Sequence, residues 1–181
     1  LQSPGQRLTF GRMIADRRTS VAFTGHRTYR GAAADALRRT VGELYARGFR
    51  NFLSGMAVGF DLAAAEAVLE LRERMPGVRL VAAVPFRGQE MRFSPADRER
   101  FRRVLAEADS VEVLAPAYHR GCYAVRNDFL VYNARVLVAW YDGSPGGTRY
   151  TVRRALGRGL EVVNLCPAAP VPPAPEPTLF G

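Results

Sequence analysis

The chain has 181 residues, of which 48% are hydrophobic, and carries a formal net charge of +9. This length supports one substantial core and favours a single domain. The two cysteines form no CxxC or CxxH pattern, which excludes a disulfide framework or a zinc finger as the basis of the fold and favours the cytoplasm. Charges interrupt every apolar stretch before it could span a bilayer, so no membrane partner is predicted.

The positive charge by itself suggests a polyanionic partner such as nucleic acid. All 26 basic residues are arginine, however, as a GC-rich coding bias would produce. The arginines are scattered, with small groups at residues 17–18, 38–39, 98–103 and 153–154. Coding bias is therefore the favoured interpretation, and a nucleic-acid partner is left open but not favoured.

Apolar, β-branched runs alternate along the chain with segments of helical spacing. In chain order we predict strands at residues 21–24, 51–54, 78–84, 110–114, 136–141 and 160–165, with helices between them at 32–48, 60–75, 95–108, 123–133 and 148–157. Gly48 is expected to stop the first helix, and the sequence Met-Pro-Gly at 75–77 the second.

The strand "RLVAAV" is apolar at nearly every position, which indicates that both faces of the sheet are covered. We therefore predict an α/β fold with a doubly wound, mainly parallel sheet in three α/β/α layers, occupying residues 19–166. Residues 1–18 are predicted to be a peripheral segment, and the proline-rich residues 167–181 a mobile tail. Ligands of such sheets bind at the carboxyl ends of the strands.

Three of the loops at those strand ends are rich in glycine: "TGHR", "SGMAVGFDLAAAE" and "YDGSPGGTRYTV". Glycine lets backbone N–H groups approach an anion, and a helix N-terminus adds about half a positive charge. The loops therefore predict a phosphate-binding edge. Neither GxGxxG nor GxxxxGK[ST] occurs, which disfavours an ordinary NAD dehydrogenase or P-loop ATPase. No cofactor and no metal ligand set is predicted.

Two carboxylates, Asp61 and Glu66, follow the second of these loops. At about 100° per residue they are separated by roughly 140° around a helix, so only one should face the ligand unless Asp61 precedes the regular helix. Asp61 is also well placed to be the helix N-cap. Either acid is a candidate general acid or water-orienting base, which leaves open whether the protein is an enzyme.

These segments, with "PFRGQE" and "RNDFLV", resemble the YpsA-like branch of the SLOG superfamily. That superfamily is a Rossmann-like group that includes the lonely-guy phosphoribohydrolases and the DNA-processing Smf proteins. The resemblance covers residues 20–165, and "YDGSPGGT" is its most specific piece. It implies a Rossmann-like fold and a nucleotide or nucleotide-derived ligand, such as a nucleoside monophosphate or an ADP-ribose-like molecule, at the carboxyl edge of the sheet.

The resemblance also implies roles for individual residues. Gly146, Gly147 and Thr148 would receive the phosphate at a helix N-terminus. His26 or Arg27 would lie near the same negative charge.

Other matched positions would contact the rest of the ligand. Arg126 and Asn127 would contact phosphate or base, and Asp142 a ribose hydroxyl. Phe86 would stack on the base and Glu90 would read it. The remaining candidate ligand-binding residues are Gly25, Ser54, Gly55, Gly59, Asp61, Glu66, Pro85, Gln89 and Gly143.

The sequence departs from the lonely-guy pattern, in which a Glu follows the "PGGxGT" turn shortly. Here Thr148 is followed by Arg149, Tyr150 and Thr151, so hydrolysis is not carried over. The leading hypothesis is a module that binds or senses a nucleotide. The alternatives are a phosphoribohydrolase-type N-glycosidase acting on nucleoside monophosphates and a Smf-like DNA-binding protein. A homo-oligomer is left open.

Overall fold

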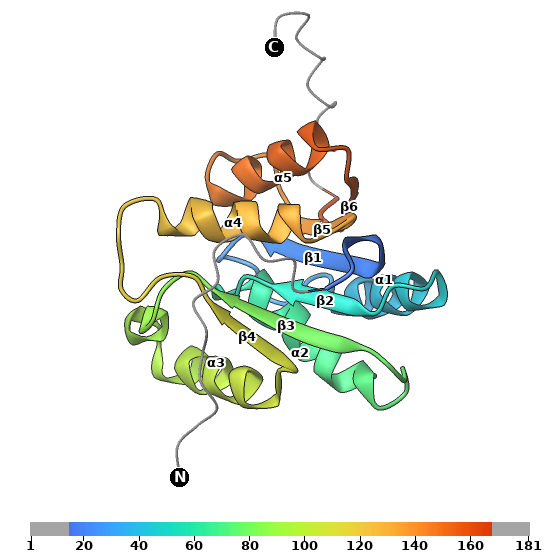
Figure 1. The fold of residues 1–181 in the computed structure, drawn as a ribbon, viewed down its shortest axis with the longest axis horizontal. Helices are drawn as coiled ribbons and strands as arrows, with labels where there is room; N and C mark the ends of the chain where they lie inside the picture. Colours follow the sequence, from blue (N-terminus) through green and yellow to red (C-terminus); the bar gives the residue numbers. More distant parts are fainter. Residues whose placement is uncertain (1–14, 168–181) are drawn as a thin grey trace, which may run out of the picture.

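In the computed structural model, which describes residues 15–167, six parallel strands form one sheet in the order β4-β3-β2-β1-β5-β6 (Figure 1). The strands are β1 (Ser20–Gly25), β2 (Asn51–Ser54), β3 (Arg79–Val84), β4 (Ser110–Val113), β5 (Val136–Trp140) and β6 (Glu161–Asn164). The helices are α1 (Ala34–Ala46), α2 (Phe60–Arg72), α3 (Pro95–Glu107), α4 (Cys122–Tyr132) and α5 (Gly147–Gly157). Every predicted strand and helix is confirmed, with ends displaced by three residues or fewer.

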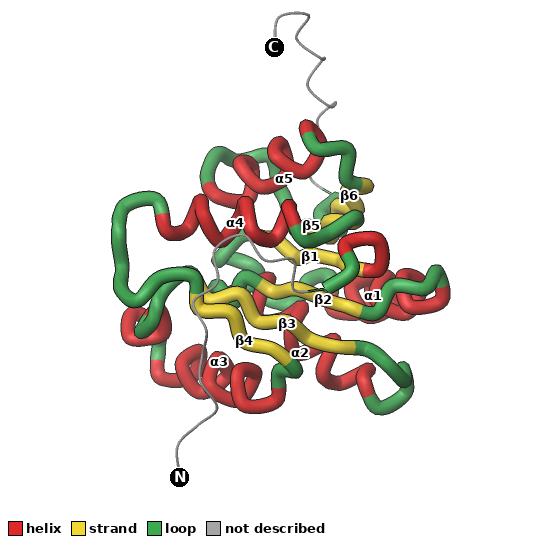
Figure 2. Tube along the Cα trace, in the orientation of Figure 1, coloured by secondary structure: helices red, strands yellow, loops and turns green. Residues whose placement is uncertain are grey.

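The helices cover both faces of the sheet, as Figure 2 shows: α4 and α5 lie on one side, and α1, α2 and α3 on the other. Successive strand residues point to opposite faces. Thus Phe52 joins the core under α1 to α3, whereas its neighbour Leu53 joins the core under α4 and α5. The predicted three-layer, Rossmann-like α/β fold is confirmed.

The ends of the first two helices follow from glycine and proline. Gly48 has a φ of 98° and ends α1, with the N–H of Phe49 donating to the carbonyl of Leu44 at 3.0 Å. The second helix ends earlier than predicted. Its last turn tightens, with the N–H of Met75 donating to the carbonyl of Arg72 at 3.1 Å, because Pro76 disfavours a helical conformation in the residue before it.

Two short 3-10 helices, η1 (Arg17–Thr19) and η2 (Gln89–Arg92), were not predicted. The first lies in the segment predicted to be peripheral. There Asp16 caps η1, and Nε of Arg17 donates to the carbonyl of Ala134 at 2.9 Å, so this part packs on the domain. Most of the predicted segment 1–18, and the tail 167–181 except Pro167, lie outside the described residues.

The connections between strands place a switch point between β1 and β5. From β1 the chain moves through β2 and β3 to the edge strand β4, then returns through α4 to β5 on the other side of β1. The loops after β1 and β5 therefore diverge to opposite faces and leave a crevice at the carboxyl ends, where such sheets bind ligands.

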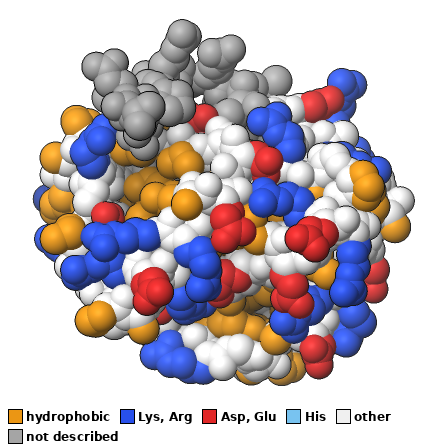
Figure 3. Space-filling model, turned by 90° about the horizontal axis from the view of Figure 1, so that it is seen from below, with side chains coloured by type: hydrophobic (Ala, Val, Ile, Leu, Met, Phe, Trp, Pro, Cys, Tyr) orange, Lys and Arg blue, Asp and Glu red, His pale blue; other side chains and the backbone are white. Residues whose placement is uncertain are grey.

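Acidic and basic side chains are intermingled on the face that carries α2 and α3 (Figure 3). Arg38 pairs with Glu70, and Arg72 with Asp109, at 3.0 and 3.1 Å. This face therefore presents no single-sign surface for a polyanion. Within residues 15–167, no helix combines the length and apolar character needed to cross a membrane.

Candidate functional site

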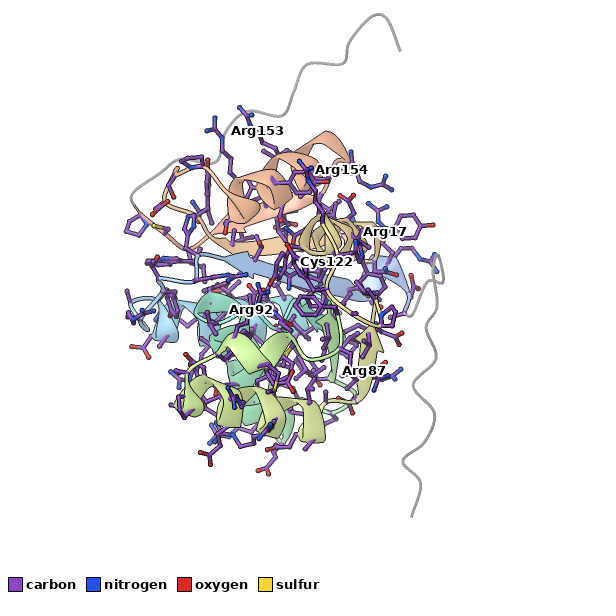
Figure 4. The ribbon with its side chains drawn as sticks, turned by 90° about the vertical axis from the view of Figure 1, so that its left-hand side faces the viewer. Arg17, Arg87, Arg92, Cys122, Arg153 and Arg154 are labelled. Carbon is purple, nitrogen blue, oxygen red and sulfur yellow. The ribbon has the colours of Figure 1, made fainter. Side chains whose placement is uncertain are left out.

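A pocket of about 290 Å³ lies at the switch point between β1 and β5. It is built by the loops after β1 and β2, the first turns of α2 and α5, and the first two turns of α4. Figure 4 looks onto this end of the sheet, with Cys122, the first residue of α4, near the middle of the view. The lining residues are Thr24, Gly25, His26, Arg27, Ala57, Asp61, Tyr123, Arg126, Asn127, Gly147 and Thr148.

One side of the pocket is positively polarised. The helix α5 begins at Gly147 after the N-cap Gly146, and the N–H groups of its first turn have no partner within the helix. The exposed side chain of Arg27 lies nearby, with its guanidinium 5.3 Å from the centre of the Tyr123 ring. This side of the pocket can receive an anion.

The same pocket is lined by a buried carboxyl group, that of Asp61, which is 4% exposed. Asp61 is the second residue of α2, whose N-cap is Gly59, so the interpretation of Asp61 as the N-cap was wrong. Burial raises the pKa of Asp61 to about 6, and the positive charge of Arg126 and backbone hydrogen bonds from Ala57 and Gly25 to the carboxyl group oppose that rise. Among the described residues, its Oδ1 has no hydrogen-bond partner.

The guanidinium of Arg126 is buried beside this carboxyl group. Burial lowers the pKa of Arg126, and the charge of Asp61 counteracts the shift. Its Nη1 donates to the carbonyl of Gly55, and its Nε donates to Oδ1 of Asn127 at 2.8 Å. A Cβ at position 55 would lie 2.8 Å from Oδ2 of Asp61 and 2.9 Å from Nε of Arg126, so only glycine allows this approach.

Two polar side chains, those of Ser54 and Gln89, hold the loop after β2 in place through hydrogen bonds. The hydroxyl of Ser54 donates to the carbonyl of Asp61 at 2.8 Å and accepts from the N–H of Met56 at 3.2 Å. Met56 is buried with a φ of 60°, a strained conformation for a residue other than glycine. Gln89 donates from Nε2 to the carbonyl of Met56 at 3.4 Å. Ser54 and Gln89 thus support the pocket rather than line it.

The loops after β1 and β5 are joined through His26. Its Nε2 lies 2.8 Å from Oδ1 of Asp142 and 3.2 Å from the backbone nitrogen of the same residue. Asp142 also accepts hydrogen bonds from the hydroxyl and the N–H of Ser144, which together lower the pKa of Asp142. Asp142, Gly143 and Gly146 therefore shape the loop that leads into α5, but they do not line the pocket.

The aromatic residue at the pocket is Tyr123, which the sequence reasoning missed. Phe86 is 5% exposed and lies behind Tyr123, with ring centres 5.9 Å apart, so the structure does not bring Phe86 to a position where it could stack on a ligand. Pro85 is buried beside it. Glu90 lies on η2, where its carbonyl accepts from Nε of Arg98, and does not line the pocket either. Tyr123 was detectable from its position three residues before Arg126, which places both on one face of a helix.

The second predicted carboxylate, Glu66, lies elsewhere. It accepts from Nε and Nη2 of Arg100 at 2.9 and 2.8 Å and from Arg103 at 3.0 Å. The expected separation from Asp61 around α2 is therefore observed. Gly59 lines a neighbouring pocket of about 540 Å³ that also includes Arg27.

An aromatic group underlies these loops. The ring of Tyr29 packs edge-on against Phe60 at 5.2 Å and against Trp140 at 5.1 Å. The carbonyl of Trp140 accepts the N–H of His26 at 3.3 Å. The end of β5 is thus packed directly against the loop that carries His26 and Arg27.

The YpsA family model, described as the YspA SLOG family, matches residues 22–159. The chain belongs to this family. The SLOG relationship inferred from the three glycine-rich loops together with "PFRGQE" and "RNDFLV" is thereby confirmed. This SLOG protein is similar to a UPF0398 protein from Bacillus thuringiensis (strain Al Hakam), with 29% identity over 132 residues that cover 71% of each chain.

Two solved structures share the SLOG fold. DNA processing protein A from Streptococcus pneumoniae aligns with a TM-score of 0.58 and 20% identity, covering 79% of this chain and 48% of that one. DNA processing protein A from Helicobacter pylori, described with a single-stranded DNA binding mode, aligns with a TM-score of 0.57 and 16% identity, covering 81% and 65%. The chain thus spans about half of the Streptococcus pneumoniae protein. At this identity the likeness is one of fold.

Proposed function

We propose that this SLOG protein binds a nucleotide or a nucleotide-derived ligand, such as a nucleoside monophosphate or an ADP-ribose-like molecule, at the carboxyl edge of its sheet. One observation carries the proposal: the exposed guanidinium of Arg27 and the first turn of α5 line the same pocket at the switch point. Both are typical partners of a phosphate group.

The phosphate is proposed to lie against Gly147 and Thr148, where free N–H groups and the helix dipole favour negative charge. The space beside Gly147 is open to a phosphate, since a Cβ built there would contact only Nδ2 of Asn127, at 3.7 Å. Arg27 supplies a fork of donors from the solvent side. Arg126 adds a second positive charge at the base of the pocket.

Replacing Arg27 with alanine is expected to weaken binding of AMP by roughly 1.5–3 kcal/mol, the range for hydrogen bonds to charged groups, and to leave binding of adenosine almost unchanged. Isothermal titration calorimetry with both ligands measures the difference. Arg39→Ala on the exposed side of α1 is the control for the loss of one charge. Equal weakening of AMP and adenosine, or of neither, would contradict the role proposed for Arg27.

Turnover separates this proposal from the N-glycosidase alternative. Asp61 is the carboxyl group in the pocket that is available for acid or base chemistry. No acidic residue follows Thr148 at the place where the lonely-guy enzymes carry their Glu. We therefore expect AMP to be recovered intact after prolonged incubation. Release of free adenine, detected by chromatography, would establish the enzyme instead.

A second candidate function, binding of single-stranded DNA, is favoured by the outer side of α5. Arginines and a tyrosine surround a groove of about 670 Å³ there. Figure 4 shows Arg153 projecting outward from this helix. Arg154 pairs with Asp128 at 3.0 Å, whereas Arg149, Arg153 and Arg158 have no acidic partner among residues 15–167. Basic and aromatic side chains together fit a single strand, and the Helicobacter pylori protein of this fold is described as binding one.

If the charge of +9 reflects coding bias, single-stranded and duplex DNA should bind only with micromolar or weaker affinity at about 0.15 M salt. Fluorescence anisotropy over a salt series measures this. The double variant Arg149→Ala/Arg153→Ala tests the groove directly, with Arg38→Ala/Arg39→Ala on α1 as the control of equal charge. Tight binding that survives this salt and is lost only in the α5 variant would establish the second function.

A further inference from the structure

The pocket contains a buried hydrogen-bond acceptor that no described residue satisfies. This acceptor is Oδ1 of Asp61, a side chain that is 4% exposed and lines the pocket. Buried polar atoms are nearly always paired, because desolvation without a partner is unfavourable. The other such atom, Oε1 of Gln89, belongs to a residue that does not line this pocket. The unpaired carboxylate oxygen therefore indicates a donor that arrives with the ligand.

The chemistry of that donor follows from the surroundings of Asp61. With a pKa of about 6, the carboxyl group is mostly ionised at neutral pH and acts only as an acceptor. The proposed phosphate position is at the start of α5, and a doubly ionised phosphate group has no hydrogen-bond donor of its own. Sugar hydroxyl groups do offer donors, and they lie close to the phosphate in any 5-phosphorylated pentose.

The size and the walls of the pocket limit how much of a nucleotide it encloses. Its 290 Å³ lie at the lower limit of small-molecule pockets, which span roughly 300–1,000 Å³. The ring of Tyr123 already faces the guanidinium groups of Arg27 and Arg126, at 5.3 and 5.9 Å, and Phe86 is buried behind it. A base could stack on Tyr123 only by competing with these guanidinium groups, so the pocket is better suited to a sugar and its phosphate than to a base.

We propose that Asp61 is a specificity-determining residue that accepts a hydrogen bond from a ribose hydroxyl, so that the pocket selects 5-phosphorylated ribose and leaves the base outside. This inference rests on the proposed function, since it requires the phosphate at α5 and Arg27. It differs from the role expected for Asp142, whose carboxylate is engaged by Ser144 and His26.

The first test uses the unaltered protein and six ligands: inorganic phosphate, ribose 5-phosphate, AMP, CMP, 2′-deoxy-AMP and 3′-deoxy-AMP. Calorimetry is expected to show AMP and CMP within about threefold of each other. It should also show at least one deoxynucleotide weakened roughly ten- to hundredfold, as expected when a donor to a buried carboxylate is removed. Ribose 5-phosphate should bind more tightly than inorganic phosphate.

The second test uses Asp61→Asn, with Asp142→Asn as the matched control. Asp61→Asn should bring AMP and the weaker deoxynucleotide to within about threefold of each other, because the amide no longer offers a charged acceptor. Asp142→Asn should keep the discrimination. Thermal unfolding of both variants checks that they remain folded. If a variant does not fold, the ligand series on the unaltered protein still tests the proposal.

The outcomes separate the two proposals. If none of the phosphorylated ligands binds, the proposed function fails and the inference fails with it. If AMP and both deoxynucleotides bind equally, or if AMP and CMP differ by more than tenfold, the nucleotide-binding function stands and the inference is overturned. Loss of discrimination in Asp142→Asn but not in Asp61→Asn overturns it as well.

Discussion

Replacing Arg126 with methionine is expected to lower the free energy of unfolding at neutral pH by about 3 kcal/mol and to weaken phosphate binding. Methionine keeps most of the buried volume but removes the positive charge that compensates the carboxylate of Asp61. A buried charge left without its partner is strongly destabilising. The carbonyl of Gly55 also loses its donor. Urea unfolding, with calorimetry for AMP, measures both effects.

The pH dependence of unfolding shows whether the loss of stability in Arg126→Met comes from the uncompensated charge of Asp61. Because the pKa of Asp61 is raised from 3.8 to about 6 on folding, its bound proton stabilises the folded chain below pH 3.8, and this contribution disappears as the pH rises through about 6. Without Arg126 the pKa of Asp61 rises further, since the guanidinium opposes the rise in the native protein. The variant should therefore be much closer to the parent at about pH 5 than at about pH 8.

A double-mutant cycle provides the control for Arg126→Met. Adding Asp61→Asn removes the uncompensated charge, so the double variant should be more stable at neutral pH than Arg126→Met alone. A loss of stability that is the same at both pH values, and is not relieved by Asp61→Asn, would show that Arg126 acts through packing alone.

Gly59→Ala is expected to lower the free energy of unfolding by roughly 3–5 kcal/mol and to displace the loop that carries Arg27. Gly59 has a φ of 84°, and a Cβ there would lie 2.6 Å from the carbonyl oxygen of His26 and 2.7 Å from that of Arg27. These contacts are with backbone, so no side-chain rotation relieves them. Strain and overpacking therefore add. Chemical unfolding and AMP calorimetry report the two consequences.

Gly31→Ala is the matched control for that prediction. Gly31 has a φ of 92°, but no atom lies within 4 Å of a Cβ built on it. It should therefore show only the strain of the left-handed conformation, about 1–2 kcal/mol, with AMP affinity unchanged. Equal losses of stability in the two variants would show that the contact between Gly59 and the His26 loop is unimportant.

The fold was predictable because local pattern and tertiary role agree along most of the chain. Strands such as β3 are apolar on both faces, and the glycines and prolines that interrupt the pattern lie close to the helix ends. The exceptions were short. The helix η2 has four residues of mixed polarity, so it shows no hydrophobic periodicity from which it could be predicted. Its backbone hydrogen bonds also depend on the conformation of the loop after β3.

The site was predictable where it depends on backbone, and less so where it depends on side chains from distant segments. Gly147 and Thr148 line the pocket because a strand end and a helix start fix their place. Phe86 was predicted to contact the ligand, whereas the aromatic residue that lines the pocket is Tyr123. Whether Phe86 or Tyr123 lines the pocket depends on how the loop after β3 packs against α4. This packing cannot be predicted from either segment alone.

The packing of Trp140 at the end of β5 also provides an optical signal for ligand binding. It is the only tryptophan in the chain, and it packs against Tyr29 while its carbonyl holds the N–H of His26. An indole in this position senses the electric field and mobility of the loop that carries Arg27. Emission excited at the red edge of the tryptophan band thus comes from one fluorophore beside the pocket, so titrations can be followed without attaching a dye.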